Sequence, residues 1–189
     1  MDIIKGVKDF WKYLKKDTWD SWLVSIVLAF IIIRFMFFPL LAFVTATPLP
    51  LVVVESCSMY HDLPFDEWWD RNDVWYENVG INEYRFDRFP FRNGFSKGDI
   101  VLVWGRGDYN VGDVIIFQSE FQHPLIHRMV SLDPIGTKGD NNVGQLAAEK
   151  NIPENAILGK AVARVPGLGW LKLIFFEPFR SPEQRGLCN

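Results

Sequence analysis

The chain has very few of the side chains that build metal sites and disulfide frameworks. Its 189 residues include 2 cysteines and 3 histidines. The cysteines, Cys57 and Cys188, show no metal-type spacing, and we expect two free thiols, with a single bridge between them as the alternative. The sequence contains no HExxH motif and no cysteine–histidine cluster, which argues against a zinc enzyme. We therefore expect a function that needs no metal and no cofactor.

A basic surface for nucleic acid is also missing. The formal net charge is -3, and no long basic patch interleaves with aromatic residues, which argues against nucleic-acid binding. Hydrophobic residues make up 49% of the chain and charged residues 23%, values typical of a globular protein. Aromatic residues, at 15%, are frequent, and such an excess often marks a membrane interface. The length suits one domain with a core, together with an anchor.

Residues 1–18 form an amphipathic basic segment. Apolar residues recur in it at helical spacing, and lysines alternate with them. The basic side suits an anionic membrane surface. The lysines are Lys5, Lys8, Lys12, Lys15 and Lys16, and the apolar residues are Ile3, Ile4, Val7, Phe10, Trp11 and Leu14.

Residues 19–46 form the predicted transmembrane anchor. The apolar run over 22–46 contains one charge, Arg34, and one proline, Pro39. About twenty apolar residues cross a bilayer as a helix, and the lysines before this run predict a cytoplasmic N-terminus. An arginine near the middle of a span costs about 2.5–3.5 kcal/mol, so the helix either continues or emerges soon after Arg34. A cleaved signal peptide is the alternative, but the apolar run is too long for one.

The rest of the chain is predicted to be a mainly β domain, made of residues 47–60 and 97–176. Its apolar runs are short and are bounded by Gly, Pro, Asn or Asp, as strands joined by turns are. The expected strands are 51–55, 99–104, 113–118, 124–132 and 156–165. The stretch 167–176 is apolar enough to contact the membrane again, and residues 177–189 form a C-terminal tail.

A long segment, residues 61–96, separates the first two expected strands and is rich in aromatic and acidic residues. A loop of this length inside a compact domain is usually functional or forms a small subdomain. Within it, we expect a helix over 65–78. Four roles remain open for this insertion: a membrane-dipping element, a lid, a partner-docking surface, or a structured insertion without a special role.

Several short motifs follow one another in order. SCSM at 56–59 comes after a hydrophobic strand, and Gly-Asp pairs at 98–99 and 112–113 begin the next two strands. PLIHR at 124–128 places a histidine inside an apolar strand, and KGDNN at 138–142 follows it. This ordered set resembles type I signal peptidases, specifically their archaeal and eukaryotic-ER branch. The resemblance covers the anchor and roughly residues 52–59 and 97–165, and its specificity lies in the order and combination of the motifs.

The resemblance implies a membrane-bound serine protease on a β-rich scaffold, which removes signal peptides after small residues. By position, Ser58 matches the nucleophile of the family, and His127 matches the histidine base of this branch. Asp140 matches the acidic residue that supports the base. Ser56 matches a serine that helps to bind the oxyanion in bacterial relatives, and the backbone N–H of Ser58 would be the second donor.

The residue types suit this chemistry. A serine hydroxyl is a weak nucleophile until a base takes its proton, and histidine, with an unperturbed pKa of about 6.5, can act as that base at neutral pH. An aspartate on the other ring nitrogen holds the tautomer and stabilises the imidazolium. Other interpretations remain for each residue: Ser58 as a strand-end serine, His127 as a core histidine, Asp140 as a turn residue, and Cys57 as the nucleophile. We expect His61 to be structural or exposed.

The chain departs from the family pattern at two places. Relatives carry a second acid a few residues after Gly-Asp-Asn, whereas this sequence continues VGQLAAEKN, with Glu149 as the nearest acid. Relatives also have a short link where this chain has residues 61–96. The first departure concerns the acid that supports the base, and the second concerns the surroundings of the site.

We therefore expect a signal peptidase that acts by acyl transfer to Ser58 and hydrolysis. Its partners would be preprotein signal peptides, membrane lipid and a secretion translocon. It would be a single-pass protein of the cell membrane, with the catalytic domain outside the cytoplasm, or on the lumen side of the ER in a eukaryote. The alternatives are a related membrane serine protease with a narrower precursor and a non-catalytic membrane-anchored accessory module on the same scaffold.

Overall fold

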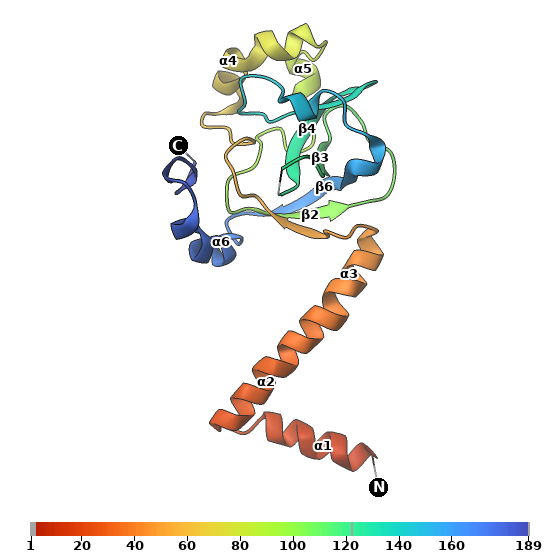
Figure 1. Cartoon of the computed structure of the whole chain (residues 1–189), viewed down its shortest axis with the longest axis vertical. Helices are drawn as coiled ribbons and strands as arrows, with labels where there is room; N and C mark the ends of the chain where they lie inside the picture. Colours follow the sequence, from red (N-terminus) through yellow and green to blue (C-terminus); the bar gives the residue numbers. More distant parts are fainter. Residues whose placement is uncertain (1–2, 122, 189) are drawn as a thin grey trace. The chain divides into compact units, whose positions relative to one another are not determined.

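A computed structural model describes residues 3–121 and 123–188 of the chain. The chain divides into two compact units, Met1–Val44 and Thr45–Asn189. The first unit is helical, and the second is built around a sheet (Figure 1). The prediction of a mainly β domain with an N-terminal apolar helix is confirmed.

The N-terminal unit contains a short helix, α1 (Ile3–Leu14), and a long helical path. The path consists of α2 (Trp19–Ile32), a π-helical turn η1 (Ile33–Phe37) and α3 (Phe38–Thr45). Within the described residues, Trp19–Thr45 is the one helix long and apolar enough to cross a membrane, with 27 residues and a mean hydropathy of 2.6.

The helical path continues past Arg34 instead of ending there. The widened turn η1 contains Arg34 and ends just before Pro39. A proline has no N–H to donate to the residue four positions earlier, and its ring crowds that turn, so a π turn is a common way to accommodate it. The structure shows a continuous helix past Arg34, and the point at which this helix leaves the bilayer stays a prediction.

The C-terminal unit has a six-stranded antiparallel sheet in the order β1-β2-β6-β3-β4-β5. The strands are β1 (Leu51–Val53), β2 (Ile100–Trp104), β3 (Val114–Phe117), β4 (Leu125–Leu132), β5 (Ile135–Lys138) and β6 (Ile157–Val165). The five expected strands are all present, within two residues at each end. Strand β5 was not expected, because four residues that include a glycine carry little alternation.

The sheet is covered on both faces, which explains why β3 has no polar side chain. Val114 and Ile116 belong to one core cluster, and Ile115 and Phe117 belong to another. Side chains alternate between the two faces of a strand, so a strand buried on both faces is apolar throughout. The first cluster also contains Met59, which is 1% exposed and lies next to Ser58 in the chain.

The two Gly-Asp pairs form the same kind of turn before β2 and β3. Gly98 and Gly112 both have positive φ values, 92° and 103°, which favour glycine. The aspartates that follow accept hydrogen bonds from backbone N–H groups three residues earlier, Ser96 and Asn110, each at 3.0 Å. These motifs therefore have a structural role at the start of the strands.

The insertion has an aromatic core of its own. It contains α4 (Phe65–Asn78), at the predicted position, and α5 (Glu83–Phe86), which lie together at one end of the sheet domain (Figure 1). Its largest rings face inward and pack against Val130 of β4. The buried residues of this cluster are Trp68, Trp69, Tyr76, Ile81, Phe86 and Val130.

The C-terminal part follows β6 with a helix, α6 (Trp170–Phe176), and two 3₁₀ turns, η4 (Glu177–Phe179) and η5 (Pro182–Gln184). The indole N–H of Trp170 donates to the carbonyl of Lys97 at 3.1 Å. The Lys97 ammonium in turn bonds the carbonyl of Gln184 at 2.6 Å and the Glu177 carboxylate at 2.8 Å. The tail is thus attached to the sheet domain by polar contacts.

The aromatic core predicts a sharp difference between two rings of α5. Phe86 is fully buried, and Tyr84 is 69% exposed. Phe86→Ala should lower the free energy of unfolding by about 3–5 kcal/mol, because it leaves a cavity among packed rings. Tyr84→Ala should cost about 1 kcal/mol or less, since it removes only a surface stacking contact with Arg88. Urea unfolding in detergent micelles, followed by near-ultraviolet circular dichroism, measures both. Equal losses would contradict the assignment of this cluster as a core.

Candidate active site

The structure brings Ser58 and His127 into contact. Ser58 lies in the turn after β1, and His127 lies on β4, 69 residues later. The imidazole Nε2 is 2.9 Å from the serine Oγ. His127 is 2% exposed, while Ser58 is half-buried, so the serine is the member of the pair that solvent reaches. A serine beside a buried imidazole is the arrangement of an activated nucleophile.

The other ring nitrogen of His127 faces Glu149 and not Asp140. His127 Nδ1 lies 2.5 Å from Glu149 Oε1, and the carboxylate is fully buried. Thr137 Oγ1 donates to the same oxygen at 3.1 Å, and the backbone N–H of Leu146 donates to Oε2 at 2.7 Å. Glu149 sits on the 3₁₀ turn η2 (Ala147–Glu149), which these bonds hold beside β5. The carboxylate is therefore fixed in one orientation against the imidazole.

Asp140 has different partners, which corrects its expected place beside the base. Arg128 Nε donates to Oδ1 at 2.9 Å, and an Arg128 terminal N–H donates to Oδ2 at 2.7 Å. The Tyr76 hydroxyl donates to Oδ1 at 3.1 Å, and His61 Nε2 lies 3.1 Å from Oδ2. The geometric reason is that β4 points His127 and Arg128 to opposite faces of the sheet, and each side chain meets a different acid.

The pKa of Asp140 is lowered far below its ordinary range. Burial by itself would raise this pKa, but the charge of Arg128 and the hydrogen bonds from His61 and Arg128 outweigh it. Asp140 is therefore a permanent carboxylate in a fully paired site. His61 was expected to be either structural or exposed, and the structure shows that it is buried. Its side chain is 2% exposed, and its ring stacks on that of Trp68 with the ring centroids 3.7 Å apart.

The turn that carries Asp140 supports residues 56–59, the candidate nucleophile segment. The Asn141 N–H donates to the carbonyl of Ser58 at 2.8 Å, and its side-chain amide donates to the carbonyl of Cys57 at 3.1 Å. A Cβ on Gly139 would lie 2.8 Å from the Ser58 carbonyl and 2.9 Å from His127 Nε2. The close approach of backbone to base thus requires glycine here, which accounts for the KGDNN motif.

Lys138, at the start of that turn, is a buried cation. Its ammonium donates to the carbonyls of Gly139 and Asp140 at 3.1 and 3.2 Å, and lies 5.1 and 4.8 Å from the ring centroids of Trp75 and Tyr76. Burial lowers the pKa of Lys138 to about 8, against the opposing attraction of Asp140 and Glu149. The turn and the helix α4 of the insertion are therefore connected by a cation–π contact.

Ser56 lies beside Ser58. Its Oγ is 3.1 Å from Ser58 Oγ, and the residue is exposed. The resemblance implied a site made of Ser56, Ser58 and His127, and the structure brings these three side chains together. It did not indicate the contact of Glu149 with His127. The signal for Glu149 was its place as the nearest acid after the Gly-Asp-Asn turn.

The expectation of two free thiols is wrong. Cys57 and Cys188 form a disulfide, with their Cα atoms 5.5 Å apart and 131 residues between them in sequence. The tail returns along the nucleophile segment, because Arg180 donates to the Glu55 carbonyl at 2.9 Å and to its carboxylate at 2.6 Å. Lys172 bonds the same carboxylate at 2.9 Å. A thiol nucleophile at Cys57 is thereby excluded.

A metal centre finds no support in the part of the chain that the structure describes. Among residues 3–121 and 123–188, no group of three or more His, Cys, Asp or Glu side chains could hold a metal ion. The side chains around Ser58 are a base, its carboxylate and a second hydroxyl, which is a set for proton transfer and acyl transfer.

Comparison with known proteins identifies similar chains in yeast. The chain is 35% identical over 98 residues to the signal peptidase complex catalytic subunit SEC11 of Saccharomyces cerevisiae strain YJM789. The same protein of strain RM11-1a matches equally. The match covers 44% of this chain and 59% of the yeast protein. No protein-family model matches the chain. The resemblance drawn from the ordered motifs is confirmed.

The lowered pKa of Asp140 predicts an acid-dependent loss of stability. The charged form stabilises the fold at pH values above the ordinary carboxyl range, about pH 4, and this contribution is lost as the pH falls below it. Asp140→Asn should cost about 3–5 kcal/mol at neutral pH, because Arg128 stays buried without its partner. Between about pH 6 and pH 3, the variant should then lose less stability than the wild type. Melting temperatures in detergent micelles measure both slopes, and parallel slopes would contradict the prediction.

The disulfide predicts a stability that depends on reductant. Replacing both cysteines by serine should lower the free energy of unfolding by about 2–5 kcal/mol, since the bridge closes a very long loop in the unfolded chain. Dithiothreitol should lower the melting temperature of the wild type toward that of the variant and leave the variant unchanged. A wild type that is insensitive to reductant after denaturation and refolding would show that the bridge does not form.

Proposed function

We propose that this chain, as a type I signal peptidase, is a membrane-anchored serine endopeptidase that removes signal peptides from preproteins. One observation carries the proposal. A buried carboxylate, an imidazole and a serine hydroxyl contact one another in sequence. Glu149 Oε1 lies 2.5 Å from His127 Nδ1, and His127 Nε2 lies 2.9 Å from Ser58 Oγ. The name of the yeast relative, which is the catalytic subunit of a signal peptidase complex, supports the same activity.

The proposed roles follow from the partners of the two ring nitrogens of His127. Glu149 accepts the hydrogen bond of Nδ1–H and thereby holds the tautomer in which Nε2 has a free lone pair. That lone pair takes the Ser58 proton as the hydroxyl attacks the scissile carbonyl carbon. The imidazolium that forms is stabilised by the buried carboxylate. Glu149 thus takes the supporting role that the motif pattern assigned to Asp140.

The negative charge on the carbonyl oxygen needs donors in the tetrahedral intermediate. We assign this role to the backbone N–H of Ser58 and the hydroxyl of Ser56, which lies 3.1 Å from the nucleophilic oxygen. Loss of one such donor typically costs about 2.7–4 kcal/mol of transition-state stabilisation. His127 then gives its proton to the leaving amine, the peptide bond breaks, and an ester links the signal peptide to Ser58. Water, activated by the same histidine, hydrolyses the ester.

The sheet offers a place for an extended substrate. Strand β1 is terminal in the sheet order and pairs only with β2, and Ser58 follows β1 by five residues. A peptide that added to the free edge of β1 would carry its scissile bond toward Ser58. We propose that such a peptide carries side chains of the size of alanine or glycine next to its scissile bond.

The anchor gives the proposed enzyme its access to substrate. With Trp19–Thr45 across the bilayer, enzyme and signal helix would share the same membrane, which raises their effective concentration. We propose a single pass with a cytoplasmic N-terminus and the catalytic unit on the outer or lumenal side. Membrane lipid and a secretion translocon would be its surroundings.

The contact between Glu149 and His127 weakens the alternative of a non-catalytic accessory module. This alternative rested on the lack of a second acid after the Gly-Asp-Asn turn, and Glu149 is in contact with the proposed base. The narrower precursor protease differs in substrate and not in mechanism, so a panel of preproteins distinguishes it.

Cleavage of a preprotein by the full chain in proteoliposomes tests the proposal. Ser58→Ala and His127→Ala should abolish cleavage after the small residue. Glu149→Gln should lower kcat by about 10⁴-fold, because an amide no longer enforces the tautomer or stabilises the imidazolium. Glu154→Gln, an exposed acid in the next 3₁₀ turn, η3 (Glu154–Ala156), is the matched control and should leave the rate unchanged. If Ser58→Ala cleaves as fast as the wild type, the nucleophile is another residue, and Ser56 is the next to test.

A further inference from the structure

We propose that α1 is an interfacial helix that binds anionic phospholipid, with the lysines of one flank on the phosphates and an acyl chain in a notch between α1 and α2. The ligand is a lipid of the bilayer that Trp19–Thr45 would cross. The proposal is independent of the catalytic assignments and depends only on the N-terminal unit.

The first observation is that α1 exposes an apolar stripe. Within the described part of the helix, no side chain is buried. At 100° per residue, its apolar side chains occupy about one third of the helix circumference. They are Ile3, Ile4, Val7, Phe10, Trp11 and Leu14, of which Ile3 is 80% and Trp11 60% exposed. A helix of a soluble domain would cover such a stripe with a core, whereas a helix lying in a membrane interface covers it with lipid.

The second observation is the position of the lysines. On the same helical wheel, Lys5, Lys8 and Lys12 fall on one flank of the apolar stripe, and Lys15 and Lys16 follow directly after the last helical residue, Leu14. Asp9 is the one acidic residue within α1, and it lies beyond the lysines. The ammoniums of Lys15 and Lys16 lie 5.6 and 5.8 Å from the rings of Trp11 and Tyr13. Basic flanks at this place attract anionic headgroups, and long lysine stems reach them from a partly immersed helix.

The third observation is that the bend between α1 and α2 is held by hydrogen bonds. The Ser21 hydroxyl donates to the carbonyl of Tyr13 at 2.7 Å, and the Tyr13 hydroxyl donates to Asp20 at 2.8 Å. The Trp22 indole donates to Asp17 at 3.2 Å. Ser21 is 1% exposed, so the first of these bonds is shielded from water. These contacts keep α1 from continuing the axis of α2, and a helix that leaves this axis at the end of a span lies along the membrane surface.

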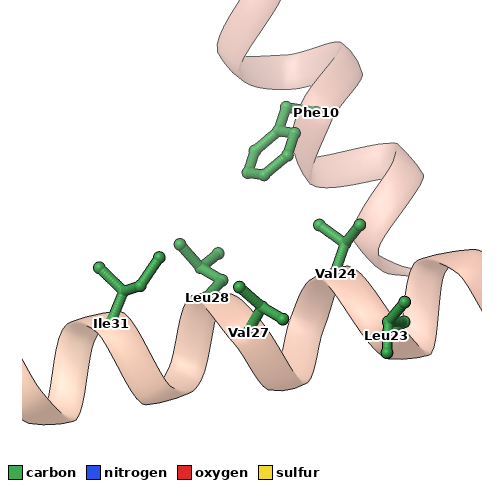
Figure 2. A pocket seen from close by; sticks show the side chains of 6 residues that line it. All are labelled: Phe10, Leu23, Val24, Val27, Leu28 and Ile31. Carbon is green, nitrogen blue, oxygen red and sulfur yellow. The ribbon is translucent and has the colours of Figure 1, made fainter.

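The bend creates an apolar notch. Its volume is about 260 Å³, and Figure 2 shows Phe10 of α1 facing the side chains of α2 across it. Its lining residues are Phe10, Leu23, Val24, Val27, Leu28 and Ile31. All of them are hydrocarbon side chains, so the notch suits an acyl chain and no polar ligand. The exposed rings of Trp19 and Trp22 lie at the same end of α2, where aromatic residues mark the headgroup level.

Lipid retention by the purified full chain tests this proposal. The chain is delipidated in detergent, mixed with equal amounts of phosphatidylglycerol and phosphatidylcholine, and examined by native mass spectrometry. The wild type should retain phosphatidylglycerol about tenfold more than phosphatidylcholine, the preference expected of a lysine cluster near a phosphate. Replacing the five lysines by glutamine should bring retention of the two lipids to equality, and replacing them by arginine should keep the preference.

The notch is tested separately. Phe10→Ser should reduce retention of both lipids and keep the preference for phosphatidylglycerol, whereas Gly6→Ser, a charge-neutral change at an open position of the same helix, should change neither. An unchanged far-ultraviolet circular dichroism spectrum shows that each variant keeps its helices. Three results would overturn the proposal: wild-type preference in the glutamine variant, displacement of the lipid by inorganic phosphate alone, or a wild type that binds no lipid and instead dimerises through α1.

Discussion

A buried ion pair between Arg128 and Asp140 is the contact on which the surroundings of Ser58 depend. Arg128 is fully buried, and its N–H groups donate to Asp140 and to the carbonyls of Pro90, Phe91 and Gly112. Removing two charges from water is costly unless each finds a full set of partners, and this pair does. Strand β4, the insertion and the turn that supports the nucleophile are therefore held by one polar network.

The two buried acids near Ser58 have separate tasks. Asp140 holds the structure around Ser58, whereas Glu149 contacts the proposed base directly. Adjacent residues on β4 cause the division, because His127 and Arg128 point to opposite faces of the sheet. The insertion contributes Tyr76 and His61 to the contacts of Asp140 and none of the described contacts of the proposed base, so it acts on the site by supporting Asp140.

The nucleophile segment is restrained from several directions. The turn at 138–142 binds its carbonyls, Met59 anchors it in the core, and the tail is bonded to Glu55 and bridged to Cys57. Each restraint reduces the number of conformations open to this segment, so that Ser58 stays within hydrogen-bond distance of His127. When catalytic groups are held in place in this way, the entropy cost of orienting them makes a smaller contribution to the activation free energy.

Local patterns in the sequence determined the five expected strands, the helix α4 and the apolar helix near the N-terminus. The pairing of Ser58 with His127 was implied by the resemblance to type I signal peptidases, which the ordered motifs carry. These features depend on short-range periodicity and on the order of motifs, which a chain displays without folding. Only the tertiary structure decided the partner of His127, the burial of His61 and the bridge from Cys57 to Cys188. Those contacts join residues 22, 79 and 131 positions apart, and which acid or thiol arrives is set by strand faces and by the path of the tail.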